Sequence, residues 1–150
     1  MPTPPESLPP FQLKYIAGKQ YIFDVIRKKY VVLSPEEGVR QELIRELIHQ
    51  RKVPKGLIAV ERGLVLNGRT KRFDLFIADR AANPLVLIEC KAPHVKIDQA
   101  VFDQLAAYNL FYKAPLLIVS NGLQRYYCKL NFESKAVSFV EDLGVYPFEV

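Results

Sequence analysis

The segment Leu85–Lys91 limits the possible folds more than any other part of the chain. Its sequence, LVLIECK, is apolar except for two charged residues near its end, and Pro93 follows shortly after. A continuous apolar run of this kind is typical of a strand that is buried on both faces of a sheet. Residues 97–112 then show helical periodicity, and Leu116–Val119 is a second apolar run. We therefore expect two parallel strands joined by a right-handed helical crossover.

Helix and strand signals on either side of this unit complete an α/β pattern. Ser34 can cap a helix, Pro35 suits its first position, and the two glutamates that follow favour the positive end of the helix dipole. We expect this helix to end near residues 51–52. The other expected strands are Gln12–Ile16, Tyr21–Ile26, Tyr30–Leu33, Leu57–Arg62, Leu64–Leu66, Lys71–Ala78, Arg125–Leu130 and Ser138–Val140. The order helix, three strands, helix and two strands predicts a mixed sheet flanked by helices.

The length of 150 residues is that of one ordinary domain. The first ten residues, MPTPPESLPP, contain five prolines and are expected to form a disordered leader, with a single domain over residues 11–150. They do not resemble a signal peptide, and no apolar run is long enough to cross a bilayer. Cys90 and Cys128 lie in apolar runs and are expected to be structural thiols. We therefore expect a cytoplasmic protein that does not act at a membrane.

A mild basic excess is consistent with a polyanionic partner. The net charge is +5, from 21 Lys and Arg residues and 16 Asp and Glu residues. Arg69, Lys71 and Arg72 lie just before Asp74 and are candidates for phosphate contacts, although a solvated hairpin would have the same composition. A second basic cluster lies upstream, at residues 27–29. The charge therefore permits nucleic-acid binding without requiring it.

Glu89 and Lys91 are the first candidate functional residues. Residues two apart in a strand point to the same face, so both charges should project from one side of the strand end. Charged side chains are rarely buried without a partner. The same Glu-x-Lys pattern recurs at residues 133–135, in a polar stretch where we interpret it as surface charge.

The turn at residues 79–84 brings Asp74 into the same region. If this turn is symmetric, Ala78 opposes Leu85 and Asp74 opposes Glu89, with Cβ atoms roughly 4.5–5.5 Å apart. Two carboxylates about 4 Å apart repel each other by about 4 kcal/mol at an effective dielectric constant of about 20. A divalent cation between them would reverse the sign of the interaction, and Mg²⁺ suits two carboxylates plus water molecules.

The two expected helices supply further polar groups to the same end of the sheet. Glu37 and Glu42 lie on the first helix and are candidates for an additional carboxylate. Gln104 and Tyr108 are four residues apart on the second helix and therefore share a face. An amide and a phenol can both hydrogen-bond phosphate or the other groups of a site.

Together these motifs resemble a known family. The pattern Asp74 … Glu89-Cys90-Lys91 … Gln104-x-x-x-Tyr108, preceded by a helical glutamate, looks like the PD-(D/E)xK nuclease superfamily. Over roughly residues 22–130 the chain is more closely similar to the N-terminal nuclease domain of type I restriction enzyme R subunits. The segments that carry this resemblance are PEEGVRQELI, RFDLFI, LIECKAP, VFDQLAAYN and LIVSNG. The resemblance implies a restriction-endonuclease-like αβββαβ core.

The resemblance also implies a metal site. Asp74 and Glu89 would hold Mg²⁺, or Mn²⁺ in its place, together with the backbone carbonyl of Cys90. Glu37 would contact the metal or its water. The expected activity is Mg²⁺-dependent hydrolysis of DNA phosphodiester bonds by an endonuclease, with DNA as the partner.

The remaining expected roles concern water and DNA. Lys91 would orient or activate the attacking water and stabilise charge on the phosphate. Gln104 and Tyr108 would steady the site and the DNA backbone, so Gln104 is also a candidate DNA contact. Phe73 stands where the superfamily motif has proline, and no helicase or translocase sequence follows.

Other interpretations stay open at this point. Asp74 and Glu89 could be an ordinary acidic pair neutralised by Lys91. The chain could also be a non-catalytic DNA-binding or assembly module that keeps the nuclease fold. In either case a separate motor or specificity subunit, or a second copy of the chain in a homodimer, is a possible partner. A small-molecule enzyme is disfavoured because the sequence has no G-x-G-x-x-G, P-loop or G-x-S-x-G motif.

Overall fold

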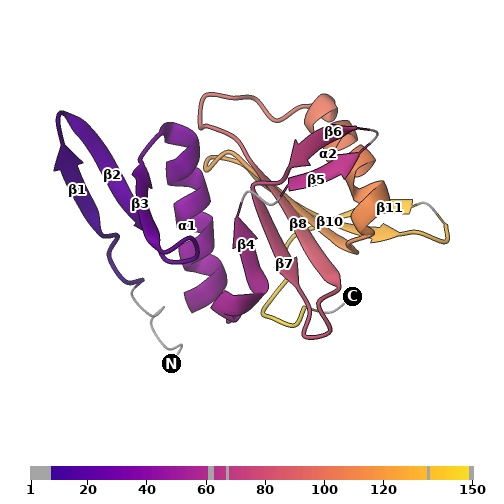
Figure 1. Ribbon diagram of the computed structural model, residues 1–150. Helices are drawn as coiled ribbons and strands as arrows, with labels where there is room; N and C mark the ends of the chain where they lie inside the picture. Colours follow the sequence, from indigo (N-terminus) through magenta and orange to yellow (C-terminus); the bar gives the residue numbers. More distant parts are fainter. Residues whose placement is uncertain (1–7, 61–62, 67, 135, 149–150) are drawn as a thin grey trace.

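A computed structural model describes residues 8–60, 63–66, 68–134 and 136–148; for residues 63–66, 69–72 and 111 it describes the backbone alone. Its helices and strands include the expected αβββαβ core, with further strands before, within and after it (Figure 1). The first half contains β1 (Leu13–Ile16), β2 (Lys19–Asp24), β3 (Lys29–Val32), α1 (Pro35–His49), a 3₁₀ turn (Lys55–Leu57), β4 (Ile58–Val60), β5 (Gly63–Leu66) and β6 (Arg69–Arg72). The second half contains β7 (Leu75–Ala78), β8 (Pro84–Cys90), α2 (Gln99–Tyr112), β9 (Leu116–Ser120), β10 (Arg125–Asn131) and β11 (Ala136–Val140).

The main sheet has six strands in the order β11-β10-β9-β8-β7-β4. Strands β8 and β9 are parallel and are joined through α2, which confirms the expected crossover pair. Their neighbours β7 and β10 run antiparallel to them, so the sheet is mixed as predicted. The carboxyl ends of β8 and β9 therefore lie at the same edge of the sheet.

Local signals explain where the two helices begin and end. The Ser34 hydroxyl accepts a hydrogen bond from the Glu37 amide at 3.1 Å and caps α1, as expected. The Asp98 carboxylate caps α2 in the same way, through the Val101 amide. Neither helix in the described part of the chain has the length and apolar character that a membrane crossing requires.

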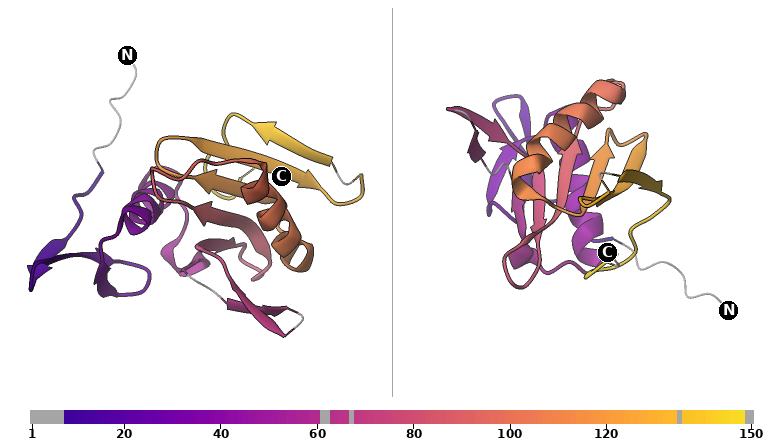
Figure 2. Two further views of the ribbon diagram at one scale, coloured as in Figure 1. Left: turned by 90° about the horizontal axis from the view of Figure 1, so that it is seen from above. Right: turned by 90° about the vertical axis from the view of Figure 1, so that its right-hand side faces the viewer.

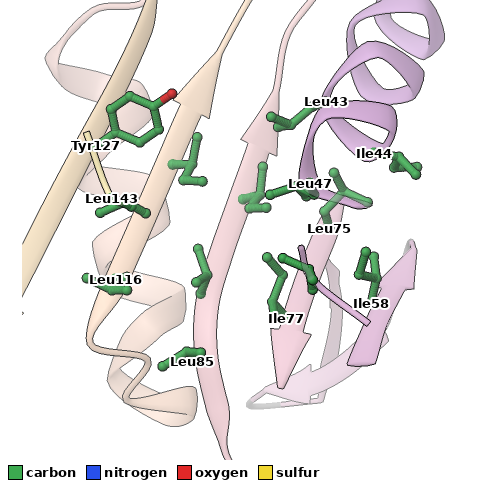
Figure 3. Packing of buried hydrophobic residues seen from close by; sticks show 14 of the residues in the cluster. Leu43, Ile44, Leu47, Ile58, Leu75, Ile77, Leu85, Leu116, Tyr127 and Leu143 are labelled. Atoms are coloured by element: carbon green, nitrogen blue, oxygen red, sulfur yellow. The ribbon is translucent and has the colours of Figure 1, made fainter. Parts of the chain in front are cut away.

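Each helix covers one face of the main sheet. On the α1 face, Leu43, Ile44 and Leu47 pack against strand residues such as Leu75 and Ile77 (Figure 3). On the opposite face, α2 packs against the sheet in a cluster of apolar residues: Phe73, Phe76, Leu87, Ile97, Leu105, Ala114, Leu117, Val119 and Cys128. Strand β8 contributes to both clusters because its side chains alternate between the faces. This burial on both faces is what its apolar sequence predicted.

One expected strand is divided in the structure. The sequence predicts a single strand over residues 71–78, but β6 ends at Arg72 and β7 begins at Leu75. Strand β6 pairs with β5 in a separate two-stranded sheet, whereas β7 belongs to the main sheet (Figure 1). The break at residues 73–74 follows from two anchored side chains, because Phe73 is buried in the α2 cluster and Asp74 is hydrogen-bonded by neighbouring elements. The β5–β6 hairpin is thus an insertion that leads directly into Asp74.

A three-stranded antiparallel sheet, β1-β2-β3, lies on the side of α1 away from the main sheet (Figure 1, Figure 2). It is the N-terminal β element that the sequence predicts. Most of the expected disordered leader, residues 1–7, lies outside the described residues. Within the described part, the Pro9 carbonyl accepts a hydrogen bond from Arg45 of α1 at 3.2 Å.

Candidate active site

Three of the predicted site residues, Asp74, Glu89 and Lys91, lie where β7, β8 and the first turn of α1 meet. The last ladder pair of β7 and β8 at this end joins Leu75 to Ile88. Asp74 directly precedes β7, and Glu89 directly follows Ile88 on β8. The register of the ladder therefore brings the two residues close together, as the symmetric turn predicts. At the turn itself a bulge shifts the register by one residue, and the shift does not reach the site end of the ladder.

The Asp74 carboxylate is held by one donor on each oxygen. Arg40 of α1 donates from Nη2 to Oδ1 at 2.7 Å, and the Cys90 amide donates to Oδ2 at 2.8 Å. Both contacts are buried, and Asp74 itself is only 9% exposed. Its orientation is therefore set by a helix on one side and by the neighbouring strand on the other. Sequence reasoning did not identify Arg40, which lies one turn after Glu36 and Glu37.

Glu89 and Lys91 form an ion pair at the end of β8, with Nζ and Oε1 3.1 Å apart. This contact confirms that the two side chains share a face. Burial and the nearby Asp74 carboxylate raise the pKa of Glu89 to about 7, although Lys91 acts in the opposite direction. Burial tends to lower the pKa of Lys91, but the Glu89 and Asp74 carboxylates outweigh it and the pKa is raised. The Asp74 and Glu89 carboxylates therefore repel each other, and the Lys91 ammonium group offsets only part of this repulsion.

The first turn of α1 adds a third carboxyl, and it belongs to Glu36. Glu36 Oε1 lies 3.6 Å from the same Arg40 Nη2 that contacts Asp74, so the two carboxyls are neighbours. Burial and the charge of Asp74 raise the pKa of Glu36. The predicted residue, Glu37, is instead paired with Arg27 and with Arg40, whose Nη1 lies 3.1 Å from a Glu37 oxygen. Both glutamates occupy the capping turn of one helix, so the sequence alone could not choose between them. The catalytic role of Glu37 stays a prediction.

Gln104 and Tyr108 pair with each other on α2. The Gln104 amide nitrogen lies 2.8 Å from the Tyr108 hydroxyl, and the Tyr108 ring packs edge-on against Phe73 with centroids 5.6 Å apart. Because Phe73 directly precedes Asp74, this pair is connected to the site through the aromatic cluster. Gln104 is exposed and available to a ligand, and its expected contact with DNA stays a prediction.

The basic residues of the hairpin precede Asp74 in the chain. Arg69, Lys71 and Arg72 belong to β6, for which the backbone alone is described. That backbone ends two residues before Asp74, so the hairpin leaves the main sheet at the site. Their expected role in DNA binding stays a prediction.

The oxygen donors of the site fit a hard divalent cation held by two protein carboxylates. Asp74 accepts two hydrogen bonds, which leaves about half of the acceptor positions of a carboxylate for other ligands. Mg²⁺ commonly takes one or two carboxylates and keeps several water molecules. Within the described residues no group of three or more His, Cys, Asp and Glu side chains is arranged around one ion position. The fit therefore rests on Asp74 and Glu89, with the Cys90 carbonyl as the expected third oxygen.

Comparisons with known proteins identify the family and the fold of the chain. Residues 35–144 match the model of the family described as the N terminus of the type I restriction enzyme R protein. Among solved structures, the chain is similar to a fragment of an HsdR subunit of a type I restriction enzyme from Vibrio vulnificus YJ016. The TM-score is 0.53 at 14% sequence identity, over 75% of this chain and 24% of the other. No curated protein matches the chain.

These matches bear on the fold and on the family. At 14% identity the structural likeness shows a shared fold, and it confirms the expected restriction-endonuclease-like architecture. The chain spans only 24% of the length of that structure, so the activity of the larger protein does not transfer with the fold. The family match covers most of the chain, from the capping turn of α1 to the segment after β11, and it includes every candidate site residue. The chain therefore belongs to the family of type I restriction enzyme R protein N-terminal domains.

Proposed function

We propose that this nuclease-like domain is a Mg²⁺-dependent endonuclease that hydrolyses DNA phosphodiester bonds. The observation that carries the proposal is the Asp74–Glu89 carboxyl pair with Lys91 beside it, at the ends of two neighbouring strands. Burial is the largest cause of the raised pKa of Glu89, and the Asp74 charge is the second. A divalent cation between the two carboxyls would offset the repulsion that Asp74 contributes. The family supports the same class of activity. We also propose a cytoplasmic location, as expected for a domain that acts on DNA.

In this proposal Asp74 and Glu89 would hold Mg²⁺ or Mn²⁺, with the Cys90 carbonyl as a further ligand. The bound metal would polarise the scissile phosphate and lower the pKa of a coordinated water molecule. Arg40 fixes the Asp74 carboxylate from the side of α1. The Cys90 amide fixes it from the side of β8, so the two carboxyls remain convergent.

The other residues act on the phosphate and on water. The Lys91 ammonium group is a compact point charge that stabilises negative charge developing on the phosphate and orients the attacking water. Gln104 and Tyr108 contact the DNA backbone from α2, and Arg69, Lys71 and Arg72 contact it from the β5–β6 hairpin. A separate motor or specificity subunit would select where the domain acts.

A plasmid cleavage assay tests the proposal. The wild-type chain and the variants Lys91→Ala and Asp74→Asn are incubated with supercoiled and linear DNA in Mg²⁺, Mn²⁺ or EDTA. The proposal predicts nicking that requires a divalent metal and is lost in both variants. A Lys129→Ala variant is the matched control, since Lys129 lies on β10, away from the site. Binding without cleavage in every metal would support the non-catalytic DNA-binding or assembly module instead.

A further inference from the structure

The three-stranded N-terminal sheet and its flanking residues carry most of the net positive charge of the chain. Residues 8–34, which contain β1, β2 and β3, include five Lys and Arg residues and a single acidic residue. The whole chain has a net charge of only +5. This sheet precedes the segment that matches the family model, so its role is not explained by that match. A concentrated positive charge on a small sheet favours a polyanionic partner.

The sheet has an outer face on which lysines and aromatic rings alternate. Lys14 of β1 opposes Tyr21 of β2, and Phe23 opposes Tyr30 of β3, so these four side chains share one face. Lys19 lies two residues before Tyr21 and projects from the same face. The Lys14 ammonium group lies 3.9 Å from the centre of the Tyr30 ring. Lys14 and Lys19 are exposed on this face.

The single acidic residue of the sheet does not neutralise these lysines. Asp24 is fully buried on the opposite face, where it accepts hydrogen bonds from Gln41 of α1 and from the side chain of Arg27. It also accepts the backbone amides of Ile26 and Arg27 in the β2–β3 turn. The Asp24 carboxylate therefore fixes the turn onto α1, and Lys28 at the tip of that turn is exposed to solvent.

The turn is connected to the candidate active site by a line of ion pairs. Arg27 pairs with Asp24 and with Glu37 of α1. Glu37 pairs with Arg40, and Arg40 pairs with Asp74 at 2.7 Å. Each of these contacts is buried or partly buried, so the position of the sheet is set relative to Asp74. A ligand bound along the sheet would therefore have a defined position relative to the site.

We propose that the outer face and turn of the β1–β3 sheet bind the phosphodiester backbone of double-stranded DNA through Lys14, Lys19 and Lys28. Backbone binding is favoured over base stacking because two of the three rings on this face are already engaged. Phe23 and Tyr30 pack edge to face with centroids 5.3 Å apart, and Lys14 covers Tyr30. The available groups are ammonium ions, which suit phosphates. The inference extends the proposed function, since it names a second surface for the same substrate.

The experiment measures binding of a fluorescent duplex by anisotropy over a series of salt concentrations, with EDTA present so that no cleavage occurs. The test variant is Lys14→Gln with Lys28→Gln. The matched control is Lys55→Gln with Lys113→Gln, which removes the same charge from two exposed lysines outside the N-terminal sheet. Each phosphate contact contributes about 0.9 to the slope of log K against log salt. The proposal predicts that the slope falls by about 2 in the test variant and stays unchanged in the control.

Three further measurements make the outcome decisive. A Lys14→Arg, Lys28→Arg variant should bind like the wild type, because it keeps the charge. A loss of slope that is equal in test and control variants would overturn the proposal, as would tighter binding to single strands or to anionic lipid vesicles than to the duplex. Thermal melting followed by circular dichroism shows that each variant is folded. Because binding is measured without a divalent metal, an inactive catalytic site would leave this result unaffected.

Discussion

Arg40 allows the most direct prediction about the forces that hold the site. Arg40 is only 5% exposed, and its guanidinium group joins two buried carboxylates, with Nη1 3.1 Å from Glu37 and Nη2 2.7 Å from Asp74. Arg40→Met keeps much of the apolar volume but removes the shared cation. Breaking a buried ion pair in this way costs about 3–5 kcal/mol, because the remaining charge is left without a partner. Glu37 keeps Arg27, so we expect a value near 3 kcal/mol.

Urea unfolding at pH 7, followed by circular dichroism, measures this loss. The exposed Arg80 in the β7–β8 turn is the matched control, and Arg80→Met should change the free energy of unfolding by less than about 0.5 kcal/mol. Adding Asp74→Asn to Arg40→Met should recover part of the loss, because the unpaired carboxylate is then gone. A loss below about 1 kcal/mol for Arg40→Met, or no recovery in the double variant, would refute the ion-pair account.

Two further predictions concern the residues next to this pair. Burial and Asp74 raise the pKa of Glu89 from 4.5 to about 7. In the absence of metal the folded chain therefore binds the Glu89 proton more tightly than the unfolded chain does. The folded chain loses stability as the pH rises from about 4.5 to 7. Glu89→Gln should therefore be more stable than the wild type at pH 8, by about 1–3 kcal/mol, and the difference should vanish below pH 4.5. A stability difference that does not change with pH would contradict the raised pKa of Glu89. Phe73 is 1% exposed and packs against Tyr108 and Tyr112. Phe73→Ala should lower the free energy of unfolding by about 3–5 kcal/mol in the same urea assay, and a loss under about 1 kcal/mol would show that the aromatic cluster does not anchor the break before β7.

The sequence predicts the parts of this molecule that depend on short-range periodicity. The parallel pair β8 and β9 follows from two apolar runs with a helix between them. Glu89 and Lys91 share a face because strands alternate with a period of two, and Asp74 lies beside them because the turn is nearly symmetric. None of these features depends on contacts between residues far apart in the chain.

The features that the sequence does not predict depend on side chains far apart in the chain. Arg40 and Asp74 are 34 residues apart, and no local sequence signal indicates that this arginine pairs with Asp74. The preference for Glu36 over Glu37 beside Asp74 depends on the rotation of α1 against the sheet. The division of the strand at residues 73–74 depends on anchors from α1, α2 and β8 together. The secondary-structure propensity of a segment does not include contacts of this kind with other segments.

The central claim is that two carboxylates from neighbouring strands form one cation site. Anomalous diffraction from crystals soaked in Mn²⁺ tests it most directly, with Asp74→Asn crystals as the control. The account predicts one strong peak within about 2.2 Å of an oxygen of both Asp74 and Glu89, and no peak in the control. Soaked wild-type crystals without a peak between these two side chains would contradict it.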